Sequence, residues 1–359
     1  MIDFRYHLVS IASVFLALAV GIVLGAGPLK GTLGDTLAAE VAQLRTDADS
    51  LRGDLAEAES GLLARDEVLG TVRPRTTSGL LAGSSVSLLT LPGSPDVALQ
   101  AARESLTEAG ATISAEVGID ESWTSDDPPD VTERTAAAGE LRELLAGDLP
   151  VGIAPERVLA LALGWALGSD PTGGPAEDAT SEPSTAPGDA ATATPTETAS
   201  REETVDDAVD GSVANSSAAG ATSTRILQIL AERGLIVTEE GLVPAQTDGV
   251  VLIAPTASDD ATAVVAWSDL AGALDEAGAV LVAGDVPEVP EADTELVEAI
   301  RLGSDLSTRV STVDNLTEPL GLLALPFAFA EQLLGQAGHY GTLDSAAGLF
   351  PPVPVEPAP

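Results

Sequence analysis

The first hydrophobic run of the chain extends from Leu8 to Leu29 and contains no charged residue. As an α-helix, this run would be about 33 Å long, which matches the hydrocarbon core of a bilayer. We therefore expect a single membrane span over residues 8–29, preceded by a short cytoplasmic end over residues 1–7. A cleaved signal peptide is the alternative, although the run is long for one and Pro28 stands where cleavage would be expected.

Basic residues flank the span on both sides, because Arg5 precedes it and Lys30 follows it. The charge comparison is nearly balanced, and we expect the N-terminus to face the cytoplasm. This orientation places the bulk of the chain outside the cytoplasm. It leaves open whether the inner or the outer membrane of a cell envelope holds the helix.

Small residues recur every four positions within the span, at Ala17, Gly21 and Gly25. Such a face lets two transmembrane helices approach closely and pack. Gly and Ala are also common in membrane helices generally, so helix packing and ordinary composition both remain open readings of this face.

Beyond the span, apolar residues recur at alternating intervals of four and three. The seam consists of Leu37, Val41, Leu44, Ala48, Leu51, Leu55, Ala58 and Leu62. An unbroken heptad pattern with charged outer positions predicts a coiled coil, here over residues 33–70, after a Gly-rich break at 30–34. We expect this coil to join copies of the chain in a homo-oligomer; a single helix packed on its own domain is the alternative.

After Pro74 the period changes, and short apolar runs alternate with helical stretches. This alternation predicts an α/β domain with a mainly parallel sheet, formed by residues 75–167 and 223–343 together. We expect Ser94 to cap a helix that begins at Pro95, and Pro326 to kink the last helix. The expected strands are 86–91, 111–117, 235–237, 250–253, 280–282 and 309–313, and the expected helices are 95–109, 259–276, 294–301 and one that begins near 318.

Between these halves, residues 168–222 are rich in Ala, Thr, Ser, Pro and acidic residues and contain almost no large apolar side chain. Such a segment buries too little surface to offset the entropy of ordering, so we expect a disordered acidic insertion. Residues 344–359 form a Pro-rich tail.

Composition narrows the classes of function. Sixteen basic against 56 acidic residues give a net charge of −40, so the chain repels phosphate backbones and nucleic-acid binding is not expected. The absence of cysteine excludes disulfides, thiolate catalysis and cysteine metal sites. No cofactor is identifiable.

Motifs of enzymes are mostly absent, since the chain has no nucleophile elbow, Walker loop or dinucleotide-binding glycine pattern. Ligands of open parallel sheets bind beyond the carboxyl ends of the strands, and several polar residues follow the expected strands. These pocket candidates are Ser94, Ser258, Asp285, Asp314 and Asn315. Residues of these types are also ordinary in turns and helix caps. An enzyme with Asp285 or Asp314 as its catalytic carboxylate is the third hypothesis, after the two non-enzymatic hypotheses given below.

Four segments together carry a resemblance to a known family: DFRYHLVSIASVFLALAVGIVLGAG at the start, the coil behind it, STVDN at 311–315 and AEQLLGQAGHYG at 330–341. In this order they resemble the actinobacterial MctB family, named for copper transport in the outer membrane. The resemblance implies a role in copper homeostasis, through copper efflux or through envelope permeability that limits intracellular copper.

Copper(I) prefers thiolate and thioether ligands, and copper(II) favours imidazole. The chain has no Cys, Met1 as its single Met, and only His7 and His339 as histidines. It also lacks the repeated alternating strands of a transmembrane barrel. Two hypotheses therefore stand: an anchored envelope protein in copper export, with copper as transported ion, or an oligomeric envelope scaffold or binding protein without metal chemistry.

Overall fold

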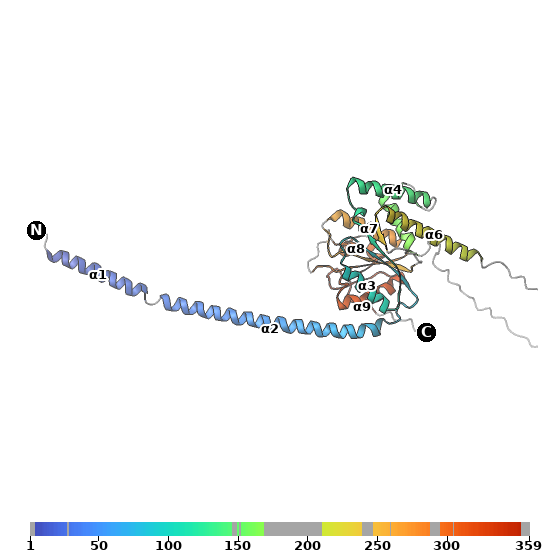
Figure 1. Cartoon of the computed structure of the whole chain (residues 1–359). Coiled ribbons are helices and arrows are strands. Elements are labelled where there is room, and N and C mark those ends of the chain that lie inside the picture. The colour runs from blue at the N-terminus through green and yellow to red at the C-terminus, as the bar shows by residue number, and fades with distance from the viewer. Residues whose placement is uncertain are drawn as a thin grey trace, which may run out of the picture. The chain divides into compact units, whose positions relative to one another are not determined.

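The computed structural model describes residues 4–26, 29–145, 149–150, 152–168, 210–238, 247–258, 260–287, 295–303 and 305–352. The chain divides into two compact units, Met1–Val68 and Leu69–Pro359. The first unit is helical, and the second contains a sheet covered by helices (Figure 1).

Helix α1 (Phe4–Ala26) contains a 22-residue stretch, Phe4–Gly25, with a mean hydropathy of 2.6. Its apolar side chains are exposed along the helix, and it is the one described helix that is long and apolar enough to cross a membrane. The helix begins earlier and ends earlier than the expected span of 8–29.

Helix α2 (Leu29–Thr77) extends beyond the expected coil at both ends. It begins at Leu29, so the break expected at 30–34 is helical instead. It also continues through Pro74, which lies in the last turns of the helix, where proline removes a single backbone hydrogen bond. Turn residues follow, and Gly79 adopts a positive φ of 79°.

The second unit is built on a seven-stranded sheet in the order β3-β2-β1-β4-β5-β6-β7. Every neighbouring pair is parallel except β2 with β3, so the expected mainly parallel α/β sheet is confirmed. Strand β1, from before residues 169–209, pairs with β4, from after them. The strands are β1 (Ser85–Thr90), β2 (Thr112–Ile119), β3 (Ile236–Thr238), β4 (Gly249–Ile253), β5 (Ala279–Ala283), β6 (Ser311–Val313) and β7 (His339–Tyr340).

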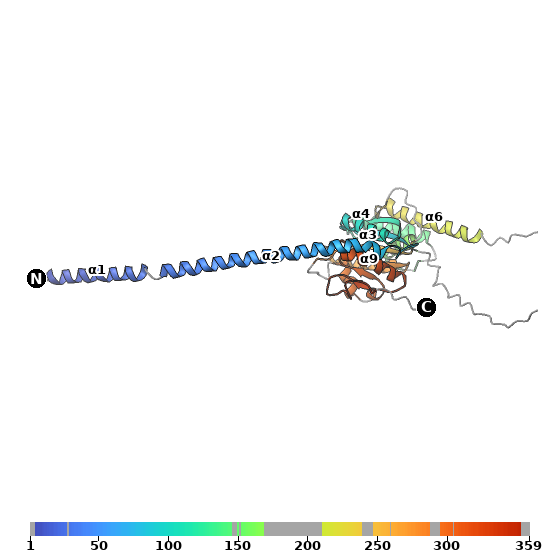
Figure 2. The same ribbon diagram turned by 90° about the horizontal axis from the view of Figure 1, so that it is seen from below.

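Successive residues of a strand point to opposite faces of the sheet, and in these strands both sets are apolar. Helices therefore cover both faces of the sheet. Leu88 and Leu89 of β1 illustrate this, since they belong to the two separate buried clusters. Helices α3 (Asp96–Glu108) and α9 (Pro319–Leu333) pack together on one face (Figure 2). The other face carries α5 (Pro155–Leu167), α6 (Asp210–Glu232), α7 (Ala261–Asp275) and α8 (Leu296–Leu302), with α4 (Pro128–Leu144) against α5 and α6.

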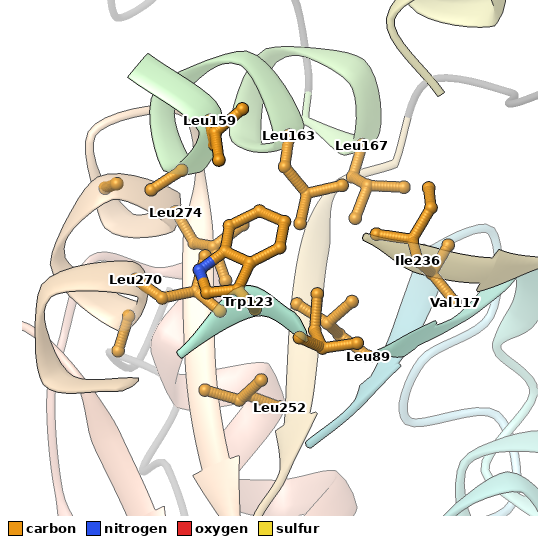
Figure 3. Packing of buried hydrophobic residues seen from close by; sticks show 14 of the residues in the cluster. Leu89, Val117, Trp123, Leu159, Leu163, Leu167, Ile236, Leu252, Leu270 and Leu274 are labelled. Atoms are coloured by element: carbon orange, nitrogen blue, oxygen red, sulfur yellow. The ribbon is translucent and has the colours of Figure 1, made fainter. Parts of the chain in front are cut away.

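The larger cluster centres on the second of these faces. Trp123, from the 3-10 turn η1 (Glu121–Trp123), packs among leucines of α5 and α7 above Leu252 of β4 (Figure 3). Helix α5 is buried almost all round, which suits an apolar helix that is too short to span a membrane.

Two expectations need correction. Helix α6 begins at Asp210, so the last part of the predicted insertion is helical; residues 169–209 lie outside the described residues, as do 353–359 of the predicted tail. Ser94 is not the cap of α3, because Pro95 occupies that position with an extended backbone and the helix begins at Asp96. Pro326 lies inside α9, which continues through it as one element, and the kink expected there stays a prediction.

The chain changes direction across the sheet between β1 and β4. From β1 it adds β2 and β3 on one side, then returns to place β4, β5, β6 and β7 on the other. In open α/β sheets such a switch point forms a crevice outside the carboxyl ends of the strands. The predicted pocket residues follow this same edge.

Candidate functional site

At the switch point, the loop after β1 lies against the end of β4. The Ser94 hydroxyl donates a hydrogen bond of 2.8 Å to the Ile253 carbonyl, and the Leu91 amide donates to the same carbonyl at 3.0 Å. A Cβ added at Gly93 would touch the Pro255 Cβ at 3.6 Å. The chain's own loops therefore contact one another where a ligand would bind in related architectures.

Ser258 lies in the loop before α7, on the surface. Its hydroxyl donates to the Asp260 carbonyl at 3.2 Å and accepts from the Asp260 amide at 3.3 Å. Asp260 in turn caps α7 by accepting from the Thr262 amide at 2.8 Å. Ser258 thus has the turn role that is ordinary for serine.

Asp285 and Asn315 come together across the ends of β5 and β6, where they form an isolated antiparallel bridge. The Asp285 carboxylate is half-buried and accepts from the Thr317 amide at 2.9 Å. The Asn315 side chain is buried, and neither its amide nitrogen nor its oxygen has a hydrogen-bond partner. The backbone of this residue is closely packed as well, because a Cβ on Gly321 of α9 would lie only 1.8 Å from the Asn315 carbonyl oxygen.

Asp314 is the centre of the polar structure at this edge. Its carboxylate forms an ion pair of 2.7 Å with Arg301 of α8, and the two side chains are 0% and 1% exposed. The same carboxylate accepts from the backbone amides of Thr342 at 2.7 Å and Leu343 at 3.2 Å. A Cβ on Gly341 would collide with it, at 1.9 Å, and Gly341 has a φ of 140° that side chains rarely adopt.

Arg301 uses its remaining donors on the same segments. It donates to the Thr312 hydroxyl at 2.7 Å, to the Tyr340 carbonyl at 2.8 Å and to the Ser345 hydroxyl at 3.2 Å. Ser345 also donates to Glu298, one turn before Arg301 on α8. A buried guanidinium with this many partners is satisfied, as burial of a charge requires.

His339 extends this network. The Thr312 hydroxyl accepts from Arg301, so its own proton points to His339 Nδ1 at 2.9 Å, and His339 Nε2 donates to the Ser307 carbonyl at 2.9 Å. Burial lowers the pKa of His339, and the Arg301 charge lowers it further, while the Ser307 hydrogen bond acts in the opposite direction. Both ring nitrogens of the neutral imidazole are occupied within the protein.

Gln332 of α9 also connects the two sequence segments 311–315 and 330–341. Its side-chain oxygen accepts from the Ser311 amide at 2.9 Å and from the Ser311 hydroxyl, and its nitrogen donates to the Arg309 carbonyl at 2.6 Å. The runs 311–315 and 330–341 are therefore two halves of one network. We call this network, made by Arg301, Ser311, Thr312, Asp314, Gln332, His339 and Tyr340, the C-terminal interlock.

Sequence reasoning placed Asp314 here but missed Arg301, its partner. Arg301 lies thirteen positions before Asp314, and nothing in the local pattern distinguishes it from an exposed helix arginine. The sequence did contain one signal for this network, namely the presence of both segments, 311–315 and 330–341, because both contribute to it.

A groove with a volume of about 530 Å³ lies elsewhere, between α5, α7, α8 and the 3-10 turn η2 (Leu306–Thr308). Arg157 forms an ion pair with Glu276 on its wall, and Arg309 pairs with Asp275 at 2.6 Å. Its lining includes none of the five predicted pocket residues.

Clustered metal ligands are not found in the part of the chain that the structure describes. Within it, no group of three or more His, Asp or Glu side chains is arranged to hold a metal ion. The carboxylates at the sheet edge serve the protein's own amides and Arg301. The arrangement can close the edge of a domain.

Comparison with known proteins gives consistent matches. A family model described as "Copper transport outer membrane protein, MctB" matches residues 1–351. Proteins named "Copper transporter MctB" from Mycobacterium bovis and Mycobacterium tuberculosis are 35% identical over 119 residues, and the one from Mycobacterium leprae is 32% identical over 119 residues. Each match covers 33% of this chain and 38% of the mycobacterial protein.

We predict that Asp314→Asn destabilises the second unit by about 3–5 kcal/mol, because Arg301 stays buried without its counter-charge. Urea unfolding followed by tryptophan fluorescence measures this, since Trp123, Trp165 and Trp267 all lie in that unit. Asp285→Asn is the matched control: the amide oxygen still accepts from Thr317, and a cost below about 1 kcal/mol is expected. Equal losses in both variants would contradict the central role of Asp314.

We also predict that the second unit loses stability as the pH falls below about 6.5. The lowered pKa of His339 means that the unfolded chain binds a proton in this range that the folded chain does not, so acid favours unfolding. His339→Gln should flatten the dependence between pH 7.5 and 5, whereas His7→Gln should leave it unchanged. An unaltered slope in His339→Gln would show that other groups cause it.

Proposed function

The chain belongs to the MctB family, and from this membership we propose that it is a membrane-anchored cell-envelope protein that takes part in copper transport or efflux and so in copper homeostasis. The match of the family model over nearly the whole chain carries this proposal. The named mycobacterial relatives support it, although the matched region spans little more than a third of their length.

Helix α1 supports the anchoring. A 22-residue apolar stretch is long enough to cross the hydrocarbon core, and exposed side chains such as Phe15 and Leu16 would contact lipid. We propose a single span with the N-terminus in the cytoplasm, which places α2 and the second unit outside it.

We further propose that copper is cargo of the process in which the chain takes part, and that the chain acts as a channel component or accessory without coordinating the ion. The composition supports this, because Met1 is the single thioether and thiolates are absent. His339 is the histidine of the second unit, and both of its nitrogens are already hydrogen-bonded.

The alternative function is an oligomeric envelope scaffold or binding protein without metal chemistry. The exposed apolar seam of α2 favours self-association in either case: Leu44, Leu51 and Leu55 are each about 60–70% exposed on the single chain. Packing of α1 through Ala17, Gly21 and Gly25 would add to the same association, since a Cβ on either glycine meets no atom within 4 Å in the single chain.

The process is tested by copper accumulation in a strain that lacks the gene for this chain. We expect the deletion to raise cell copper in copper-supplemented medium, and the full chain to restore the original level. Leu16→Arg with Val20→Arg should fail to restore it, because two charges in the middle of α1 oppose insertion by about 2.5–3.5 kcal/mol each. Leu16→Phe with Val20→Ile is the matched control and should restore it fully; unchanged copper in the deletion strain would contradict the proposal.

The accessory mechanism is tested by titrating the purified full chain in detergent with Cu(I) and with Cu(II). We expect no stoichiometric binding of either ion. Binding of one copper per chain that is lost in His339→Gln or in His7→Gln would overturn the accessory mechanism and leave the role in copper export intact.

A further inference from the structure

The exposed seam of α2 has a defined heptad register. Leu37, Leu44 and Leu51 fall at position d, and Val41 and Leu55 fall at position a. Leucine at d with a β-branched residue at a favours two strands over larger bundles, and Val41 with Leu44 provides this combination in one heptad. The other a positions are Ala48, Leu55 and Leu62. The seam lies in the first unit and remains exposed there, with Leu51 at 68%.

Charged residues flank the seam in an ordered way. The g positions are acidic at Glu40, Asp47 and Asp54. The first e position of the seam is Ala38, and the next two are basic, at Arg45 and Arg52. The two flanks of this stretch therefore have opposite sign.

This arrangement distinguishes between the two orientations of a helix pair. In a parallel pair each g residue faces the e residue five positions later on the other helix, which brings Glu40 to Arg45 and Asp47 to Arg52. In an antiparallel pair g faces g, so Glu40, Asp47 and Asp54 would meet one another and repel. The charges favour the parallel orientation.

The same charges favour an unshifted register. A shift by one heptad would bring Asp47 to Glu59 and Asp54 to Asp66 on one side of the pair. In the unshifted pair each flank carries two attractive contacts and one repulsive one, between Asp54 and Glu59. Ala48 and Ala58 then face their own copies, so each small side chain of the seam lies opposite another small side chain.

Arg52 has donors available for such a contact. Within one chain its Nη1 bonds Asp49 at 2.7 Å, and both side chains are about three-quarters exposed. A guanidinium has five donor hydrogens, so a contact with Asp49 leaves others to face Asp47 of a second helix. Arg65 at the next d position after Ala58 is charged, and the apolar seam ends before it.

From the seam and its flanks we propose that α2 binds a second copy of this chain as a parallel, in-register, two-stranded coiled coil whose orientation and register are set by Glu40–Arg45 and Asp47–Arg52 contacts between the copies. This inference rests on the self-association proposed above and specifies its partner and geometry. Exposed ion pairs contribute little to affinity individually, so their role is to select one arrangement of the apolar seam.

The charge pattern is tested by reversing one flank at a time in the full chain, purified in detergent. The acidic variant carries Arg45→Glu with Arg52→Glu, and the basic variant carries Glu40→Arg with Asp47→Arg. Each should self-associate about tenfold more weakly than the parent, because four attractive contacts become repulsive, and the two variants mixed together should regain parental affinity. The control, Glu57→Arg with Glu67→Arg at outer positions, should associate like the parent.

Orientation and register are tested by disulfide trapping, which the absence of native cysteine makes unambiguous. Leu44→Cys and Leu55→Cys, made separately, should each give a covalent dimer under mild oxidation, because each residue faces its own copy. Thr46→Cys, at an outer position, should not.

The outcomes separate the two levels of the proposal. A monomeric mass for the parent would overturn the self-association itself. A trimeric mass would overturn the two-stranded state. A dimeric mass without trapping at both 44 and 55, or without rescue by mixing the charge variants, would overturn the parallel in-register geometry and leave self-association standing.

Discussion

Burying a full positive and a full negative charge in a protein interior is tolerated only when each finds a partner and the remaining donors and acceptors are filled. The ion pair of Arg301 and Asp314 meets this condition with backbone amides, carbonyls and hydroxyls drawn from α8, β6 and the segment after α9. The positions of β6, β7 and the last described loop depend on it. Gly341 shows how tightly the loop is held, because any side chain there would occupy the space of the carboxylate.

Much of this fold could be predicted from sequence, because the sheet residues are apolar in short runs and because α3 and α9 begin beside Pro95 and at Pro319. Helices α4 and α5 also begin at prolines, Pro128 and Pro155, but they were not among the expected helices. Strand β4 and helix α9 lie where the pattern put them. The polar details could not be predicted in the same way. Ser94 was expected at a helix start, yet it contacts Ile253, 159 residues away in sequence, and local propensity contains no information on such a contact.

The position of the candidate site residues could be predicted from the sequence, but their role could not. Asp285, Asp314 and Asn315 do lie at the carboxyl edge of the sheet, as the topology required. Whether such residues surround a ligand or hold the chain together depends on Arg301 and on Thr342 and Leu343, which reach them only in three dimensions. The insertion was predicted from composition, and that reasoning missed the start of α6 because Ala-rich polar sequence is compatible with helix as well as with disorder.

The position of the interlock along the chain has a consequence for biogenesis. Asp314 acquires its amide donors from residues 342 and 343, and Arg301 acquires a carbonyl acceptor from residue 340, so these buried charges stay incompletely satisfied until that segment has been made. An incomplete polypeptide emerging from the ribosome therefore has a strong physical reason to remain unfolded in its second unit. The buried pair therefore favours a folded second unit only once the segment that follows α9 has been synthesised, which agrees with the proposed export of this unit.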